Sequence, residues 1–242
     1  MIVCIMQFSV AYGQSVDFNK VILPENVTAS SFEEKLVQLA WKNHPTNKIA
    51  LKNVEIASKE RNLARWKWLD DIYATGNLNE YTINPSPDAP TNMFFPRYNF
   101  GIRVSLGTFV STPIRSRIES DNIVNSEHEV NERKLIVREQ VLAGLEKLKQ
   151  YYKFMKLREQ IKEDFLTMYK DAEKKFSLGE VDIEKYRSSV QSYYNQAEEV
   201  VEAQTNYNSA KIALEALVGV SILEIDGYQQ FLQKLDAEIK ID

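Results

Sequence analysis

Few residues in this chain have the types and the spacing that chemistry requires. Its two histidines are far apart: His44 directly precedes Pro45, and His128 stands between Glu127 and Glu129. These settings are typical of histidines on helix surfaces, and no glycine-rich phosphate loop or Ser/His/Asp spacing occurs. The acidic residues alternate with Lys and Arg, as on a solvated helix face. We therefore expect no enzyme, no cofactor and no metal site.

The single cysteine, the net charge and the hydropathy exclude further classes. Cys4 lies in an apolar stretch, residues 1–14, that resembles a secretory signal peptide; an uncleaved apolar N-terminus is the alternative. With the leader removed, neither disulfides nor thiolate metal sites are expected. A net charge of −4 and a pI near 5.5 predict no nucleic-acid partner. Beyond the leader, no segment approaches the roughly 18 apolar residues of a membrane-spanning helix, so a helical integral membrane protein is excluded.

The first elements after the leader are two predicted helices, over residues 32–44 and 46–69. Apolar residues recur at helical spacing in both segments. Ser31 is suited to cap the first helix, because Glu34 follows three residues later as in a capping box. Pro45 ends that helix, since the residue before a proline avoids helical geometry.

The second half of the chain predicts two long antiparallel helices. All seven prolines lie at or before Pro113, which suits the first position of a helix over residues 113–178. A helix of this length would span about 97 Å, and its apolar residues step by threes and fours as in a coiled coil. Gly179 would end it, a return helix over residues 182–218 would follow, and residues 220–242 form a short amphipathic tail.

Between these helical parts, two segments alternate apolar and polar residues with a period of two. They predict strands over residues 71–82 and 98–109, separated by a proline-rich loop. One solution for this hairpin is a soluble sheet packed on one side; the other is a transmembrane barrel with one face in lipid and one toward a wet lumen. In a barrel, the lipid-facing residues would be Ile72, Leu78, Phe100, Ile102, Val104 and Leu106. The lumen-facing residues would be Tyr73, Thr75, Arg103 and Ser105.

Arg103 is the one charge at the middle of a predicted strand. In a barrel it would bias permeation electrostatically. In a soluble sheet it would be a rim arginine.

This order of elements resembles one repeat of the TolC-like outer-membrane efflux protein family. The resemblance covers roughly residues 32–219. It is carried by LVQLAWKNHPTNKIALKNVEIASKERNLARW, by the second strand with TPIRSRI, and by YKDAEKKFSLGEVDIEKYRSSVQSYYNQAEEVVEAQTNYNSAKIALEALVG. It implies a mainly α fold of long coiled-coil helices, with a β-hairpin contributed to an oligomeric transmembrane β-barrel.

The resemblance also implies a function, a location and partners. The chain would be an outer-membrane channel component of a tripartite efflux or type I secretion-like system, a passive conduit whose helical part crosses the periplasm. Residues 85–97 would form an extracellular loop. A periplasmic tip would meet a periplasmic adaptor attached to an inner-membrane transporter; its residues would be Ser177, Leu178, Gly179 and Glu180.

The chain departs from the family pattern because family members usually carry two such repeats. Two strands cannot close a barrel, so about six copies, or a related TolC-like subunit, would have to complete it. The alternative functions are a periplasmic coiled-coil scaffold and a truncated family member that forms no channel. A periplasmic adaptor would need a lipoyl-like β-domain, and no run of strands predicts one. No residue separates the possible exported substrates.

Overall fold

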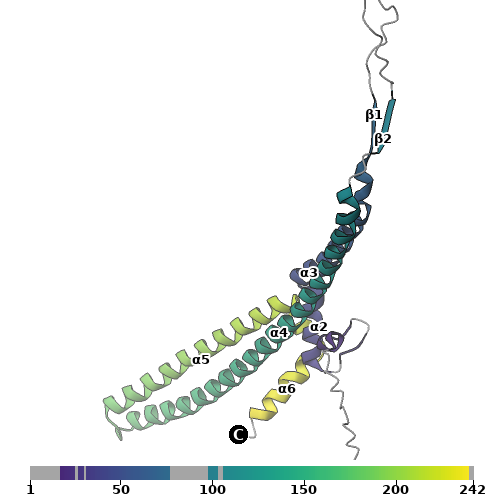
Figure 1. Cartoon of the computed structure of the whole chain (residues 1–242). Helices are drawn as coiled ribbons and strands as arrows, with labels where there is room; N and C mark the ends of the chain where they lie inside the picture. The colour runs from purple at the N-terminus through teal and green to yellow at the C-terminus, as the bar shows by residue number, and fades with distance from the viewer. Residues whose placement is uncertain (1–16, 25–26, 30, 77–97, 103–105, 240–242) are drawn as a thin grey trace, which may run out of the picture. The chain divides into compact units, whose positions relative to one another are not determined.

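The chain forms two compact units in a computed structural model that describes residues 17–24, 27–29, 31–76, 98–102 and 106–239. One unit contains the helical hairpin and comprises Met1–Lys48 and Asn131–Asp242; we call it the hairpin unit. The other contains the two strands and comprises Ile49–Val130; we call it the strand unit. Figure 1 shows the elements of both units. The predicted signal peptide, residues 1–14, lies outside the described residues. The prediction of a mainly helical chain with long packed helices is confirmed.

The first helices of the chain follow its capping and breaker residues. α1 (Phe18–Val21) is a single turn that the sequence analysis did not predict. α2 (Phe32–Asn43) begins where the Ser31 side chain accepts a hydrogen bond from the Glu34 backbone N–H at 3.2 Å. α3 (Pro45–Trp66) follows directly and passes into a 3₁₀ helix, η1 (Lys67–Asp71). The predicted helix over residues 46–69 therefore ends earlier as an α-helix.

Two long helices dominate the chain, α4 (Leu106–Ser177, 72 residues) and α5 (Ile183–Val218, 36 residues). Asp182 caps the start of α5, and its carboxylate accepts a hydrogen bond from the Lys185 backbone N–H at 2.9 Å. α4 begins before its predicted start, so Pro113 lies inside it. The strand predicted over residues 98–109 is therefore wrong for residues 106–109, which are helical. The strand prediction failed there because the stretch is short, and four residues that alternate between apolar and polar also fit one helical turn.

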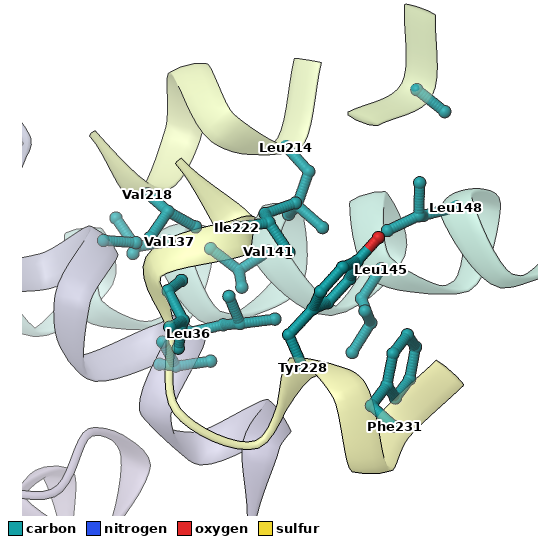
Figure 2. Packing of buried hydrophobic residues seen from close by; sticks show 14 of the residues in the cluster. Leu36, Val137, Val141, Leu145, Leu148, Leu214, Val218, Ile222, Tyr228 and Phe231 are labelled. Carbon is teal, nitrogen blue, oxygen red and sulfur yellow. The ribbon is translucent and has the colours of Figure 1, made fainter. Parts of the chain in front are cut away.

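The core of the hairpin unit gathers five elements that are far apart in the sequence. α2, α4, α5, a short 3₁₀ helix η2 (Ile222–Glu224) and the last helix α6 (Tyr228–Ile239) all contribute buried side chains. Figure 2 shows these side chains converging from the separate ribbons. Those with less than 2% of their surface exposed include Leu36, Val37, Val141, Leu145, Leu148, Leu214, Val218 and Ile222. Burial of this kind contributes about 1.5–3 kcal/mol for each large aliphatic side chain.

Arg138 attaches the N-terminal segment to this core. Its guanidinium donates to both carboxylate oxygens of Glu34, at 2.9 and 2.5 Å, and to the Val21 carbonyl at 2.8 Å. The paired geometry joins α2 to α4 and holds the end of α1 beside them, since a guanidinium matches a carboxylate with two parallel hydrogen bonds. Glu34 therefore contributes to both the cap and the tertiary contact.

Two linked tyrosine contacts hold α6 against the long helices. The Tyr152 hydroxyl donates to an Asp236 carboxylate oxygen at 2.7 Å, and the Tyr207 and Tyr228 hydroxyls share a hydrogen bond of 2.9 Å. The rings of Tyr152 and Tyr207 lie 5.6 Å apart between their centroids. Burial raises the pKa of Tyr152 and of Tyr228 well above that of a free tyrosine. The folded state thus holds both phenols neutral.

We expect Tyr152→Phe to lower the free energy of unfolding by about 1–2 kcal/mol at neutral pH, because Asp236 loses its donor. A phenol with a raised pKa in the folded state contributes stability below its unfolded pKa of about 10, and this stability is lost as the pH rises above that value. The variant should therefore lose less stability than the native chain between neutral pH and about pH 11. Urea unfolding at several pH values measures both effects.

The control for this experiment is Tyr194→Phe, because Tyr194 is exposed. Its unfolding free energy and its alkaline dependence should match those of the native chain. Equal behaviour of Tyr152→Phe and Tyr194→Phe would contradict a stabilising role for the Tyr152–Asp236 contact.

The strand unit joins α3, η1 and the first part of α4 to two short strands. β1 (Ile72–Gly76) and β2 (Tyr98–Ile102) pair antiparallel. Ala57 and Ala64 of α3 and Val130 of α4 are buried, and Ala64 lines the same small cavity as Thr108 and Thr112 of α4. The α3 and α4 segments of this unit therefore pack side by side through small residues.

Candidate functional site

The end of the helical hairpin is the first candidate site, and a glycine shapes it. Gly179 has φ = +73°, a left-handed conformation that favours glycine. Its N–H bonds to the Phe176 carbonyl at 3.0 Å, and the Glu180 N–H bonds to the Lys175 carbonyl at 2.9 Å. This pair of bonds is a Schellman motif, which satisfies the last carbonyls of α4 and reverses the chain before Asp182 caps α5. The four residues predicted for the tip, Ser177, Leu178, Gly179 and Glu180, therefore form one defined turn.

Large apolar side chains are exposed at this turn, among charged residues such as Lys174, Lys175, Glu180 and Asp182. Leu178 is 63% exposed and Ile183 is 50% exposed, and on α4 Phe176 and, about two turns further from the tip, Met168 are also exposed. We call Met168, Phe176, Leu178 and Ile183 the tip patch.

An aromatic ladder joins α4 to α5 behind the tip patch. The Phe176 and Tyr186 rings stack with centroids 5.0 Å apart, and the Tyr169 and Tyr193 rings stack at 5.7 Å. The Tyr169 and Tyr186 rings, 6.3 Å apart, connect these two pairs. Stacked aromatic pairs contribute about 0.5–1.5 kcal/mol beyond their burial, so the ladder keeps the exposed end of the hairpin closed.

Tyr169 is the member of the ladder with perturbed chemistry. A hydrogen bond with Tyr186 and its position beside Glu173 raise the pKa of Tyr169 to about 12. The sequence analysis predicted apolar residues at coiled-coil spacing on the long helix but did not identify the ladder. The available signal was the seven-residue spacing of aromatic residues on both helices, Tyr169 to Phe176 and Tyr186 to Tyr193.

The strand pair is the second candidate site. Its register matches Ile72 with Ile102 and Ala74 with Phe100, and it matches Tyr73 with Gly101 and Thr75 with Asn99. Because directly paired residues share one face of an antiparallel sheet, the first two pairs belong to one face and the last two to the other. The fifth pair, Gly76 with Tyr98, belongs to the first face, so the register separates Ile72, Ala74, Phe100 and Ile102 from Tyr73, Thr75 and Asn99.

Several residues predicted for the barrel faces cannot be assigned to this pair. Leu78, Arg103, Val104 and Ser105 lie outside the described residues. Leu106, predicted to face lipid from a strand, is instead the first residue of α4, so that prediction is wrong. The extracellular loop predicted over residues 85–97 also lies outside the described residues.

The two histidines do not form a site together. His44 caps the C-terminus of α2, and its ring lies against the Thr46 hydroxyl, whereas His128 is exposed on α4. Within the described ranges, no cluster of three or more His, Cys, Asp or Glu side chains has the arrangement of a metal site. In the same ranges, no helix is both long and apolar enough to cross a membrane.

Among the described residues, the tip patch and the strand pair are thus the two candidate sites. Comparisons with protein-family models, with curated proteins and with solved structures gave no match for this chain.

Proposed function

We propose that this chain is one subunit of an outer-membrane channel of the TolC-like type, a passive conduit for export. The observation that carries the proposal is the register of β1 and β2, which groups Ile72 and Ala74 with Ile102 and Phe100 on one face. A two-stranded sheet is marginal alone in water, so an apolar face needs a cover. In a closed barrel, that cover is lipid on one face, while the other face lines a wet lumen.

The helical hairpin supports the same proposal. α5 has 36 residues, which correspond to about 54 Å of helix. In the proposed channel, α4 and α5 extend through the periplasm, and the tip patch docks a periplasmic adaptor attached to an inner-membrane transporter. Exposed Leu178 and Ile183 are suited to such a contact, since large apolar side chains contribute most when a partner buries them.

The proposed channel requires more than one chain. A spanning sheet must be closed, because unpaired backbone groups are costly in lipid, and two strands cannot close. About six copies would supply about twelve strands, and a related subunit with strands of its own would serve equally. No catalysis is proposed, since conduction through such a pore needs only a lined passage.

The test compares Ile102→Asp with Thr75→Asp, which stand on opposite faces by register. We expect Ile102→Asp to abolish the detergent-resistant oligomer in the outer-membrane fraction, because a charged side chain on the lipid face of a barrel destabilises it. Thr75→Asp should still assemble, since its face is wet. Sedimentation of native-cell membranes, followed by mass measurement in detergent, gives both results.

Assembly of both variants in the outer membrane would show that the paired apolar face does not meet lipid. A native chain recovered as a soluble periplasmic monomer or dimer would instead favour the coiled-coil scaffold. In that case, the tip patch and the helix surfaces would bind partner helices, and the strand pair would have no membrane role.

A further inference from the structure

The end of the strand unit where α3 passes into η1 holds a cavity lined by both signs of charge. The cavity has a volume of about 140 Å³ and lies between residues 64–71 and residues 108–115. Lys67 and Arg115 contribute positive charges, and Asp70 and Asp71 contribute negative charges. A single water needs only about 10–15 Å³ of such space, so the cavity has room for a larger polar group.

Helical spacing brings three hydroxyl groups to the same cavity. The residues of α4 that line it are Thr108, Ser111, Thr112 and Arg115. Their spacing of three, four and seven residues places them on one face of the helix. Hydroxyl groups and a guanidinium donate hydrogen bonds, and a guanidinium matches phosphate oxygens with two parallel bonds. With Lys67 on η1 lining the same cavity, the α4 side is suited to bind a phosphate group.

The charges around the cavity do not neutralise one another. No ion pair joins Lys67 or Arg115 to the neighbouring carboxylates, or to any other residue that the structure describes. A simple anion between the two cations would be repelled by Asp70 and Asp71, and a simple cation would be repelled by Lys67 and Arg115. A ligand that carries a phosphate and an ammonium group together would satisfy both signs of charge.

Large apolar side chains are exposed at this same end of the strand unit. Their exposed fractions are 41–69%, and we call them the junction belt: Trp66, Trp68, Leu69, Phe109 and Val110. Lys67 and Thr108, which adjoin members of the belt in the sequence, line one cavity, so the belt and the cavity occupy the same end of the helix pair. Tryptophan is buried in most folds but is enriched where a membrane surface meets water.

The cavity and the belt lie at the base of the strand pair. η1 ends at Asp71 and β1 begins at Ile72, the next residue. Figure 1 shows β1 and β2 at this end of the strand unit. In the proposed channel the strands lie in the membrane, so their base is level with the phospholipid headgroups on the periplasmic side. In that layer, phosphate and ammonium groups occur together beside acyl chains.

We propose that this cavity binds the headgroup of a phosphatidylethanolamine molecule. Lys67, Arg115 and the hydroxyl groups of α4 hold the phosphate, and Asp70 and Asp71 accept hydrogen bonds from the ammonium group. The acyl chains lie on the junction belt. The inference rests on the proposed membrane location of the strand pair, but it adds a specific lipid site that a passive conduit does not require.

The same chemistry separates this lipid from two others. Phosphatidylglycerol has a phosphate but no cation, so it leaves Asp70 and Asp71 without a partner and is repelled by them. Phosphatidylcholine has a cation without N–H groups, so it cannot donate hydrogen bonds to the two carboxylates. Phosphatidylethanolamine alone among the three matches both sides of the cavity.

Quenching of tryptophan fluorescence by brominated phospholipids tests the site in the full chain, purified in detergent. Trp41→Phe is the background, because Trp66 and Trp68 are then the only tryptophans of the three that remain. The three lipids, with identical brominated chains, are added in turn to the micelles. We expect phosphatidylethanolamine to give half-maximal quenching at about a fivefold lower mole fraction than the other two.

Charge substitutions then assign the preference to the cavity. Lys67→Gln combined with Arg115→Gln should remove it, because glutamine is polar but uncharged. Asp70→Asn combined with Asp71→Asn should make phosphatidylglycerol quench at least as well as phosphatidylethanolamine, since the repelling carboxylates are gone. The matched control is Arg117→Gln, an exposed position of α4 outside the cavity lining, which should keep the preference.

The outcomes separate failure of this site from failure of the channel. Equal quenching by the three lipids, or a preference that survives Lys67→Gln with Arg115→Gln, would overturn the headgroup site while the belt still meets lipid, as the channel requires. No quenching by any lipid would refute the membrane location and the site together. Full displacement by an equal concentration of soluble phosphoethanolamine would mean that the cavity takes a free headgroup from water, which overturns the lipid site.

Discussion

Replacing Asn47 by leucine should lower the free energy of unfolding by about 3 kcal/mol. Asn47 is fully buried, and its amide N–H groups donate to the Ala40 and Trp41 carbonyls, both at 3.1 Å. These carbonyls belong to the last turn of α2, where the helix itself supplies few donors. Leucine has a similar volume but no polar atoms, so the Trp41 carbonyl and the Arg133 side chain would lose their partner, at about 1–3 kcal/mol for each unsatisfied group.

Urea unfolding followed by circular dichroism measures this loss, and Asn62→Leu is the control. Asn62 is exposed on the same helix, α3, so its substitution should change the unfolding free energy by no more than about 0.5 kcal/mol. Equal stability of the two variants would contradict the role assigned to Asn47.

Arg133 allows a second test of the same contact. Its Nε donates to the Asn47 side-chain oxygen at 3.1 Å, and its Nη2 donates to the Thr46 hydroxyl at 2.9 Å. Arg133→Met should therefore cost less in the Asn47→Leu background than in the native chain. Additive losses would mean that the two side chains do not act together.

Asn47 also illustrates what the sequence could not predict. An asparagine near the start of a helix, among lysines and threonine, has the local pattern of a surface residue. It is buried because Arg133, 86 positions later, and the end of α2 meet it. The local features were predictable: the Ser31 cap, the Asp182 cap and the glycine after each long helix follow from residue type and spacing. Long-range polar contacts do not, because no local periodicity encodes them.

The candidate sites likewise combine features that the sequence predicts with features that it does not. The alternation around Ile72 and Ile102 predicted which residues share a face. Among the strand residues that the structure describes, the register of β1 and β2 groups the residues in the same way. The start of α4 at Leu106 was missed, since a few residues of alternation do not separate a strand from a helical turn. The aromatic ladder was missed because heptad-spaced tyrosines on two helices also fit an ordinary coiled-coil seam.

The two glycines that end the long helices should respond very differently to alanine. Both have positive φ angles, +73° at Gly179 and +78° at Gly219, so alanine should cost about 1 kcal/mol at either position from backbone strain. At Gly179, an added Cβ meets no atom within 4 Å. At Gly219, it would lie 2.9 Å from the Asn43 Cβ, too close for two carbon atoms.

The clash at Gly219 also breaks a contact between helices. Asn43 lies at the end of α2, and its Nδ2 donates to the Val218 carbonyl at 3.0 Å, so moving it separates the ends of α2 and α5. We expect Gly219→Ala to lower the unfolding free energy by about 3 kcal/mol and Gly179→Ala by about 1 kcal/mol. Gly144→Ala is the control for added volume, because its Cβ would lie 3.3 Å from the end of the Leu214 side chain without a positive φ.

Urea unfolding of the three variants separates strain from crowding. Gly144→Ala should be nearly neutral, since alanine gains about 1 kcal/mol of helix propensity against a small displacement of Leu214. Equal losses at Gly179 and Gly219 would mean that Asn43 yields without cost and that the α2–α5 contact is loose. A larger loss at Gly219 than at Gly179 would mean that the base of the helical hairpin is its rigid end. The tip would then require only the left-handed backbone conformation of Gly179 in one turn.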